Sequence, residues 1–341
     1  MKKSLIAIAA LAAAGAAAAQ SSVTLYGVID TGYGFQRTKE RASTGAPTVS
    51  KRANGVMSGN LSGSRWGLKG QEDLGNGLSA VFNVEAGFDS ADGKFSGGGF
   101  NRRSVVGLKG NFGQVVIGRD YTPMDAVASG FQAIDTVTED NVLGLDKGSA
   151  FYTPRATGFH YSGDFSGVKV QAFAGQHRTK VSTAGAVNTD KKTEGYGLGL
   201  GYANGPFAIQ AAVQQFKTKE TTPAGTATGR TTEYGIGASY DFTAAKLMAH
   251  YIADKPRGSK AIQQFGVGVD IPVDAVTIGV QYAHNKADRL KGHDFGIQAS
   301  YALSKRTDLY ARALRHNSWK HKNSGYKTHT DTYVVGIRHR F

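Results

Sequence analysis

The 341-residue chain has no cysteine, few prolines and, after its first residues, no long apolar run. The lack of cysteine excludes disulfide frameworks, thiolate zinc sites and cysteine nucleophiles. From Ser22 onward we find no convincing helical periodicity, and no apolar run approaches the ~20 residues that a spanning helix needs. Glycine, in contrast, occurs 46 times, tyrosine 15 times and phenylalanine 17 times. This length and composition allow either two soluble domains or one large all-β domain.

The first residues have the pattern of a cleavable export signal. Two lysines precede an apolar run over residues 5–19 that ends in three alanines, the small residues that signal peptidase requires. A membrane anchor is the alternative, but the run is too short to span a bilayer. We therefore expect residues 1–19 to be a signal peptide, and loss of its lysines lowers the formal charge from +14 to +12.

The rest of the chain repeats one unit, ten to fifteen residues of alternation followed by a turn. In 78–88 one face is apolar and the other is mostly small or polar, and in 195–202 Tyr and Leu alternate with four glycines. A two-residue period is that of a β-strand with two different faces. We predict about sixteen strands, near 22–36, 60–73, 76–90, 99–110, 113–121, 148–161, 167–178, 194–204, 206–218, 230–241, 244–254, 260–271, 274–286, 290–303, 306–318 and 326–341.

The connections between these strands alternate in length. Tight turns such as 111–113 alternate with long polar loops at about 37–59, 121–147, 178–193 and 218–230. An even number of strands with short turns at one end and long loops at the other is typical of a bacterial outer-membrane barrel. The sequence therefore predicts an all-β chain, a transmembrane antiparallel β-barrel over residues 20–341.

The charged register decides between a soluble and a membrane barrel. It carries residues such as Arg65 and Glu85, and it holds too much charge for the dry interior of a soluble sandwich. Sixteen strands also close into a cylinder too wide for side chains to fill. Closure satisfies every backbone amide, as lipid demands. We therefore expect apolar residues to face lipid and charged residues to line water.

Five stretches form a specific set: QSSVTLYGVIDTGYGF, SRWGLKGQEDLGNGLSAVFNVE, NRRSVVGLKGNFGQVVIGRDYTP, FYTPRATGF and the terminal VGIRHRF. Together they resemble the trimeric general porins of Gram-negative bacteria, in particular the β-proteobacterial branch. The resemblance implies a sixteen-stranded barrel, a homotrimer and a third extracellular loop that folds inward to narrow the pore. It implies a water-filled channel in the cell outer membrane for passive diffusion of small hydrophilic solutes and ions, without enzymatic activity or cofactor.

Strand register predicts which basic residues reach the channel. Arg65 and Arg103 alternate with apolar outward residues, so both should point into the lumen, followed on the same strands by Lys69 and Lys109. The resemblance adds Arg102, because the basic cluster at the family's constriction includes the arginines of the S-R-x-G-L and R-R-S motifs. Of the adjacent Arg102 and Arg103, Arg103 fits the inward-facing positions of the strand better.

The long loop at 121–147 is acidic and should face this basic wall. An acidic loop opposite basic residues sets up a field that sorts ions by sign without a binding site. Anion-selective relatives place a further arginine shortly before the YTP segment, where this chain has residues 144–147, Gly-Leu-Asp-Lys. We therefore expect a modest anion preference. The candidate loop acids are Asp125, Asp135, Glu139 and Asp140.

Three other functions fit the sequence less well than a general channel. Nucleic-acid binding is disfavoured because the basic residues are dispersed and no recognition motif is present. A substrate-specific channel would need an aromatic or sugar-binding ladder inside the lumen, whereas most aromatics fall on the outward register. A barrel enzyme would need a Ser/His/Asp set that strand parity brings together, and none is found. The nine histidines show no metal-ligand spacing, which leaves metal binding unknown.

The chain ends on an alternating segment, 326–341, that should pair with the first strand and close the barrel. Arg338 and Arg340 fall on the inward register, and Phe341 falls on the outward one. A terminal phenylalanine resembles the signal that the outer-membrane assembly machinery reads. Basic residues of the extracellular loops should meet the phosphates of lipopolysaccharide. The expected partners are thus two further copies of the chain, outer-membrane lipid, the assembly machinery and small solutes.

Overall fold

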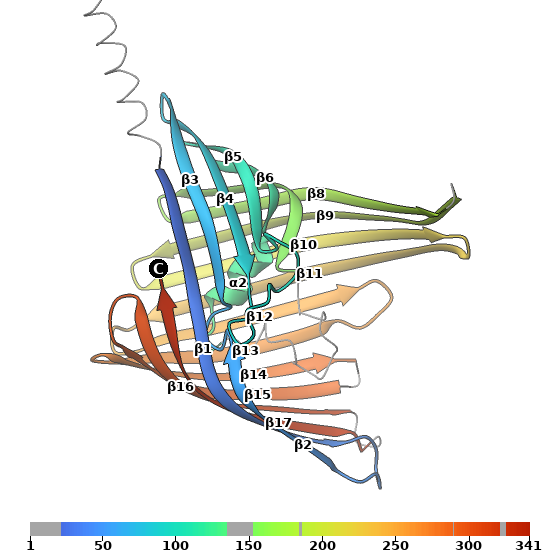
Figure 1. Ribbon diagram of the computed structural model, residues 1–341, viewed down its shortest axis with the longest axis vertical. Coiled ribbons are helices and arrows are strands. Elements are labelled where there is room, and N and C mark those ends of the chain that lie inside the picture. The colour runs from blue at the N-terminus through green and yellow to red at the C-terminus, as the bar shows by residue number, and fades with distance from the viewer. Residues whose placement is uncertain (1–21, 135–152, 184–185, 289, 321–324) are drawn as a thin grey trace, which may run out of the picture.

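The computed structural model describes residues 22–134, 153–183, 186–288, 290–320 and 325–341. The expected signal peptide, residues 1–19, lies outside this part of the chain. No helix among the described residues is long and apolar enough to cross a membrane. One sheet contains all the named strands (Figure 1). They are β1 (Ser22–Arg41), β2 (Val49–Ser58), β3 (Arg65–Gly75), β4 (Leu78–Gly87), β5 (Arg103–Gly110), β6 (Gly113–Tyr121), β7 (Arg155–Phe165), β8 (Val168–Thr183), β9 (Ala186–Asn204), β10 (Phe207–Thr222), β11 (Gly225–Asp241), β12 (Lys246–Pro256), β13 (Ile262–Val273), β14 (Val276–Ala287), β15 (Leu290–Ala302), β16 (Thr307–Lys320) and β17 (Lys327–Arg340).

Strands β2 and β3 share one position in the sheet. The first part of β1, Ser22–Val28, pairs with β3, and its later part, Thr31–Glu40, pairs with β2. The 17 strand segments therefore form 16 barrel strands. β17 runs antiparallel to β1 from Val28 to Arg41 and closes the cylinder. This closed antiparallel barrel confirms the fold class that the sequence predicts.

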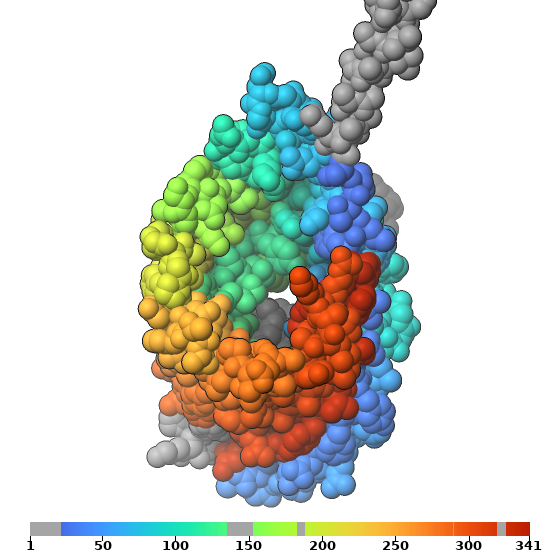
Figure 2. Space-filling model, turned by 90° about the vertical axis from the view of Figure 1, so that its left-hand side faces the viewer, coloured from blue at the N-terminus to red at the C-terminus, as the bar shows by residue number. Residues whose placement is uncertain are grey.

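The two faces of the barrel wall have opposite polarity. Along β9, the outward side chains of Leu198 and Leu200 are 48% and 53% exposed. The inner face instead buries polar side chains, among them Gln214, Gln264 and Asn285. The ring of strands surrounds an opening (Figure 2). An apolar outer face with a polar inner face reverses the arrangement of a soluble protein and is typical of a membrane barrel.

Three connections predicted to be long loops, at 37–59, 178–193 and 218–230, are largely strand. The ladders β1–β2, β8–β9 and β10–β11 continue through most of these residues. Two of these hairpins, β8–β9 and β10–β11, extend well past their neighbours (Figure 1). The predictions were wrong because both faces of such a hairpin meet water, so the apolar–polar alternation that marks a strand is lost. Cross-strand pairs such as Arg178–Asp190, at 2.5 Å, stabilise the extensions instead.

Several strands around the first long connections are shorter than predicted. β3 begins at Arg65 instead of residue 60, β4 ends at Gly87 instead of 90, and β5 begins at Arg103 instead of 99. β7 begins at Arg155, and residues 148–152 of its predicted range lie outside the described part of the chain. The freed residues form turns with their own hydrogen bonds, such as Gly59 N to Asp30 O at 2.9 Å. These turns border the interior of the barrel.

Candidate functional site

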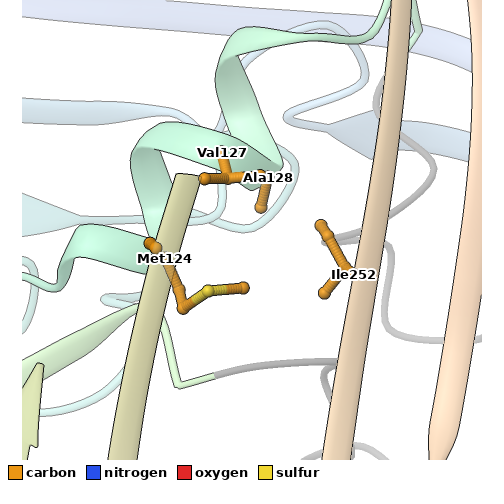
Figure 3. Close-up of a cluster of buried hydrophobic side chains, with 5 residues drawn as sticks. Met124, Val127, Ala128 and Ile252 are labelled. Carbon is orange, nitrogen blue, oxygen red and sulfur yellow. The ribbon is translucent and has the colours of Figure 1, made fainter. Parts of the chain in front are cut away.

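A short helix lies against the inner face of the barrel wall. Helix α2 (Pro123–Gly130) follows β6, with proline at its first position, where the missing N–H leaves no intrahelical bond unmade. Its Met124, Val127 and Ala128 are fully buried and pack with Ile252 of β12 (Figure 3) and with Ala212 of β10. The chain therefore leaves β6 and crosses the interior to strands far away in the sequence.

Inward-facing glycines provide the seat for this segment. A Cβ atom at Gly237 would lie 2.3 Å from the Phe131 ring, and one at Gly235 would lie 3.1 Å from Met124 Cε. A Cβ at Gly268 would lie 3.0 Å from the backbone nitrogen of Ala133. The alternating glycines of β11 and β13 are thus places where the crossing segment approaches the wall too closely for any side chain.

Polar side chains fix both described ends of the crossing connection. His250 Nδ1 lies 3.0 Å from the Phe131 carbonyl, and Gln281 Oε1 accepts a 2.9 Å hydrogen bond from Ala133 N. After the gap, Thr153 donates from N and Oγ1 to the buried Glu233 carboxylate, both at 2.8 Å. The middle of the connection, with the candidate acids Asp135, Glu139 and Asp140, lies outside the described residues. The inward fold of the whole third loop therefore stays a prediction, which these anchors support.

One buried carboxylate joins two of the predicted arginines. Glu85 of β4 is 4% exposed and accepts a 2.6 Å hydrogen bond from Arg102 Nε. Arg65 Nε lies 3.8 Å from the same carboxylate, and the Tyr26 hydroxyl donates to it at 2.9 Å. A carboxylate with these partners is satisfied on both oxygens and holds the two guanidinium groups in place. Arg65 and Arg102 are thus brought together, with a net charge of +1 for the group.

A second arginine group surrounds Tyr121 at the end of β6. The Tyr121 hydroxyl accepts hydrogen bonds from Arg102 Nη2 at 2.7 Å and from Arg155 Nη2 at 3.0 Å. The Arg155 guanidinium also stacks over the tyrosine ring, 4.4 Å from its centroid. Arg103 takes a separate partner, Asp120, at 2.9 Å. Phenol and guanidinium therefore form a rigid basic surface beside the start of α2.

These groups line one cavity of about 960 Å³ inside the barrel. Arg65, Arg102, Arg155 and Arg312 line it from the wall and its adjoining turns, and Asp125 lines it from the first turn of α2. An acidic group of the crossing segment and four arginines thus border the same water-filled space. Of the four predicted loop acids, Asp125 is the one within the described residues, and it lies at this cavity.

The remaining predicted basic residues lie beside this cavity, not in it. Lys69 and Lys109 line a smaller space of about 330 Å³ together with Arg103 and Gln114. Register placed these residues inward correctly, since they share that face. Arg102, which parity ranked below Arg103, lines the main cavity because it precedes β5 and escapes the strict alternation of the strand.

Sequence reasoning missed Arg155 and Arg312. Arg155 stands within the FYTPRATGF stretch, so the motif itself contains the signal that could have identified it. Arg312 of β16 alternates with Ala311 and Ala313, the outward residues of that strand, and the same parity argument would have found it.

An inward turn at 59–64, of which residues 60–64 were predicted to be strand, also borders the main cavity. The buried Asp30 carboxylate accepts from Leu61 N at 2.6 Å, from Ser62 N at 2.7 Å and from the Tyr310 hydroxyl at 2.6 Å. The Arg312 guanidinium donates to the Asn60 carbonyl. Asp30 thus connects β1, the turn and β16. No pattern in the sequence of 60–73 predicts this contact.

Comparison with known proteins identifies the family. A model of the Gram-negative porins matches residues 5–318. The chain belongs to the Gram-negative porin family. The porin is 34% identical over 333 residues to outer membrane porin protein 32 of Delftia acidovorans, which covers 91% of this chain and 88% of that protein. It is 33% identical over the full length of both chains to the major outer membrane protein P.IB of Neisseria lactamica.

A solved structure gives the same fold. The anion-selective porin from Comamonas acidovorans superimposes with a TM-score of 0.71 at 27% identity, covering 94% of this chain and all of that one. The porin is therefore a channel of the Gram-negative outer membrane and not an enzyme, as predicted. Among the described residues, no group of three or more potential ligands is placed to hold a metal ion.

Proposed function

We propose that this porin is a general diffusion channel with a modest preference for anions, set where the arginines of the wall face α2. The observation that carries the proposal is the composition of the main cavity. Four arginines border it against the carboxylates of Asp89 and Asp125, with Glu85 buried beneath two of the arginines. The described lining is thus basic, but only by one or two charges.

The fixed geometry of these charges supports selection by sign. Arg102 is hydrogen-bonded to Glu85 and Tyr121, so its guanidinium group keeps a fixed position beside the cavity. A side chain without these bonds would move among several rotamers. Charges in a narrow tube with low-dielectric walls act on a passing ion more strongly than in bulk solvent. Asp125 and the acids predicted for the undescribed part of the loop oppose them. A small excess of positive potential gives a small preference for anions.

Reversal potentials across planar bilayers in a KCl gradient test the proposal. We expect a potential of the sign that anion flow produces, well below the value for an ideally anion-selective membrane. The anion-selective neighbour with 27% identity points the same way. A clear cation preference would overturn the proposed role of the basic cavity.

We further propose that the porin forms a homotrimer after export, with residues 1–19 removed, and that Phe341 acts as its assembly signal. Phe341 exchanges two 3.1 Å backbone hydrogen bonds with Gly27 and so adds the last rung of the β1–β17 seam. Its ring occupies the space that a Cβ of Gly27 would need, 2.4 Å from Cζ. The small, partly exposed outward residue Ala80 is suited to contact with a neighbouring subunit, whereas Ala86 is already buried within the chain.

Deletion of Phe341 should reduce the assembled oligomer at the outer membrane, measured by gel mobility of unboiled against boiled samples. Phe341→Ala separates the two contributions, because it keeps the backbone rung and removes only the ring. We expect Phe341→Ala to lower assembly as the deletion does, and Phe341→Tyr to preserve it. Normal assembly of Phe341→Ala would reduce the residue to ordinary packing of the seam.

A further inference from the structure

Two histidines face each other on the outer side of the barrel. His284 of β14 stands directly opposite His293 of β15 in the antiparallel ladder. Their Nδ1 atoms lie 3.3 Å apart, and the centroids of their rings lie 4.7 Å apart. Both side chains share the register of Tyr282 and Phe295, which are 38% and 50% exposed on the outer face. The pair therefore points away from the channel and takes no part in conduction.

The pair lies at the extracellular edge of the membrane-spanning wall. His293 lies nine residues before Ala302, where β15 ends at the short turn to β16. A strand crosses the hydrocarbon in about 9–11 residues. The next outward pair along the same ladder is Lys286 opposite Lys291, and both of these residues are exposed. Because the lysines lie among headgroups and water, ions in solution can reach the histidines directly below them.

Neighbouring groups hold the two imidazoles in this arrangement. The Tyr282 ring stacks on His293, with the ring centroids 5.6 Å apart and an angle of 26° between the planes. The Tyr282 hydroxyl lies 2.5 Å from His293 Nδ1, the same nitrogen that faces His284. The backbones of both histidines belong to an unbroken ladder of paired residues. The two nitrogens are thus preorganised, which lowers the entropic cost of using both as ligands.

The separation of the two nitrogens matches that of a metal chelate. Two imidazole nitrogens that each bind zinc at about 2.05 Å, with a tetrahedral angle between them, lie about 3.3 Å apart. The Nδ1 atoms of His284 and His293 are separated by 3.3 Å. The same distance is long for a hydrogen bond, whose heavy atoms usually lie about 2.7–3.2 Å apart. Sequence spacing does not mark this pair, because the two residues lie nine positions apart on the two arms of a hairpin.

We propose that His284 and His293 form a binding site for a divalent transition-metal cation of the Zn²⁺ class, with water completing its coordination. Imidazole nitrogen is a preferred ligand of Zn²⁺ and Cu²⁺, whereas Ca²⁺ and Mg²⁺ take oxygen ligands. The hydrogen bond between the two Nδ1 atoms uses one proton, which moves through solvent to Nε2 of the same ring. Both Nδ1 lone pairs then face the cation. The site lies on the opposite face of the wall from the basic cavity, so this proposal and the proposed ion preference can fail separately.

Lys286 and Lys291 have two opposite effects on this site. A neighbouring positive charge disfavours the imidazolium form of histidine, and only neutral imidazole binds a metal. The same charges repel a bound cation and weaken its binding. Both lysines are exposed and have long flexible side chains, so their amines can turn away into solvent that screens them. We therefore expect weaker binding than in a zinc site with three or four protein ligands.

The test measures Zn²⁺ binding to the folded porin in detergent by equilibrium dialysis, after a chelator has removed any metal. His284→Gln and His293→Gln should each weaken Zn²⁺ binding by at least about tenfold, since each removes one of the two nitrogen ligands. His177→Gln, which removes an exposed histidine of the β8–β9 hairpin, should leave binding unchanged. Electron paramagnetic resonance of bound Cu²⁺ should show coupling to two nitrogens, and both variants of the pair should lose that signal.

A further variant keeps the result interpretable if loss of a histidine disturbs the hairpin. Lys286→Gln with Lys291→Gln removes two positive charges beside the cation but no ligand, so it should tighten Zn²⁺ binding severalfold. A merely destabilised barrel would not bind the cation more tightly. Absence of Zn²⁺ binding, or equal affinity in the unchanged porin and both histidine variants, overturns the proposal. An unchanged affinity in the lysine variant would also overturn it, because the cation would then lie elsewhere.

Discussion

Replacing Arg65 and Arg102 together by alanine should turn the proposed modest anion preference into a cation preference. The two arginines share Glu85, at 3.8 and 2.6 Å, so their removal leaves that carboxylate as an additional negative charge beside Asp89 and Asp125. Two unit charges about 8 Å from a passing ion contribute on the order of 1–2 kcal/mol at water-like to intermediate dielectric. That corresponds to a roughly five- to thirtyfold change in the permeability ratio. Reversal potentials in a KCl gradient should therefore change sign.

A matched pair of outward substitutions separates local from net charge. Arg178→Ala with Lys192→Ala removes the same formal charge from directly opposed positions on the outer face of β8–β9. At 0.1 M salt the Debye length is about 10 Å, so these positions are screened from the interior. We expect the outward pair to leave the reversal potential unchanged. An equal shift in both double variants would show that net charge, and not the cavity, sets the preference.

The face on which each wall residue lies can be predicted, because it depends on residues close by in the sequence. Lipid on one side and water on the other force a two-residue alternation, so Arg65, Lys69, Arg103 and Lys109 could be assigned to the inner face from neighbouring residues alone. The same argument fails wherever a residue leaves the ladder. Arg102 precedes its strand, and the hairpins beyond the membrane lose the apolar register that would have marked them.

The interior depends on contacts between distant parts of the sequence. The turn at 59–64 exists because Asp30 and Tyr310 meet beneath it, and they are 280 residues apart. The glycine at position 237 appears only as a small lumen-facing residue until Phe131 is seen against it. Periodicity gives the face on which a residue lies but not the segment that crosses the barrel to meet it. The basic wall was therefore predictable, and the seat of α2 was not.

That seat leads to the second large expected effect, which is a loss of conductance in Gly237→Leu. Any side chain at this position collides with the Phe131 side chain, whose ring atoms Cδ2 and Cγ and methylene Cβ would lie 2.3, 2.6 and 2.9 Å from the new Cβ. Overpacking of this kind costs about 1–3 kcal/mol, and the wall behind Gly237 is a hydrogen-bonded ladder that does not yield. The Phe131 ring can move only toward the lumen, and we expect helix α2, which directly precedes it, to move with it. Single-channel recording should show a reduced open-channel conductance.

The same strand provides the control, because Gly229 lies on the same register and has no atom within 4 Å of its Cβ position. Gly229→Leu should therefore conduct as the unchanged porin does. Adding Phe131→Ala to Gly237→Leu removes the colliding ring, so the leucine can occupy its space and conductance should recover. Recovery is the decisive outcome, since a merely destabilised barrel would lose further stability from the second substitution. If conductance stays low in the double variant, or never falls in Gly237→Leu, the segment 123–134 does not control the width of the channel.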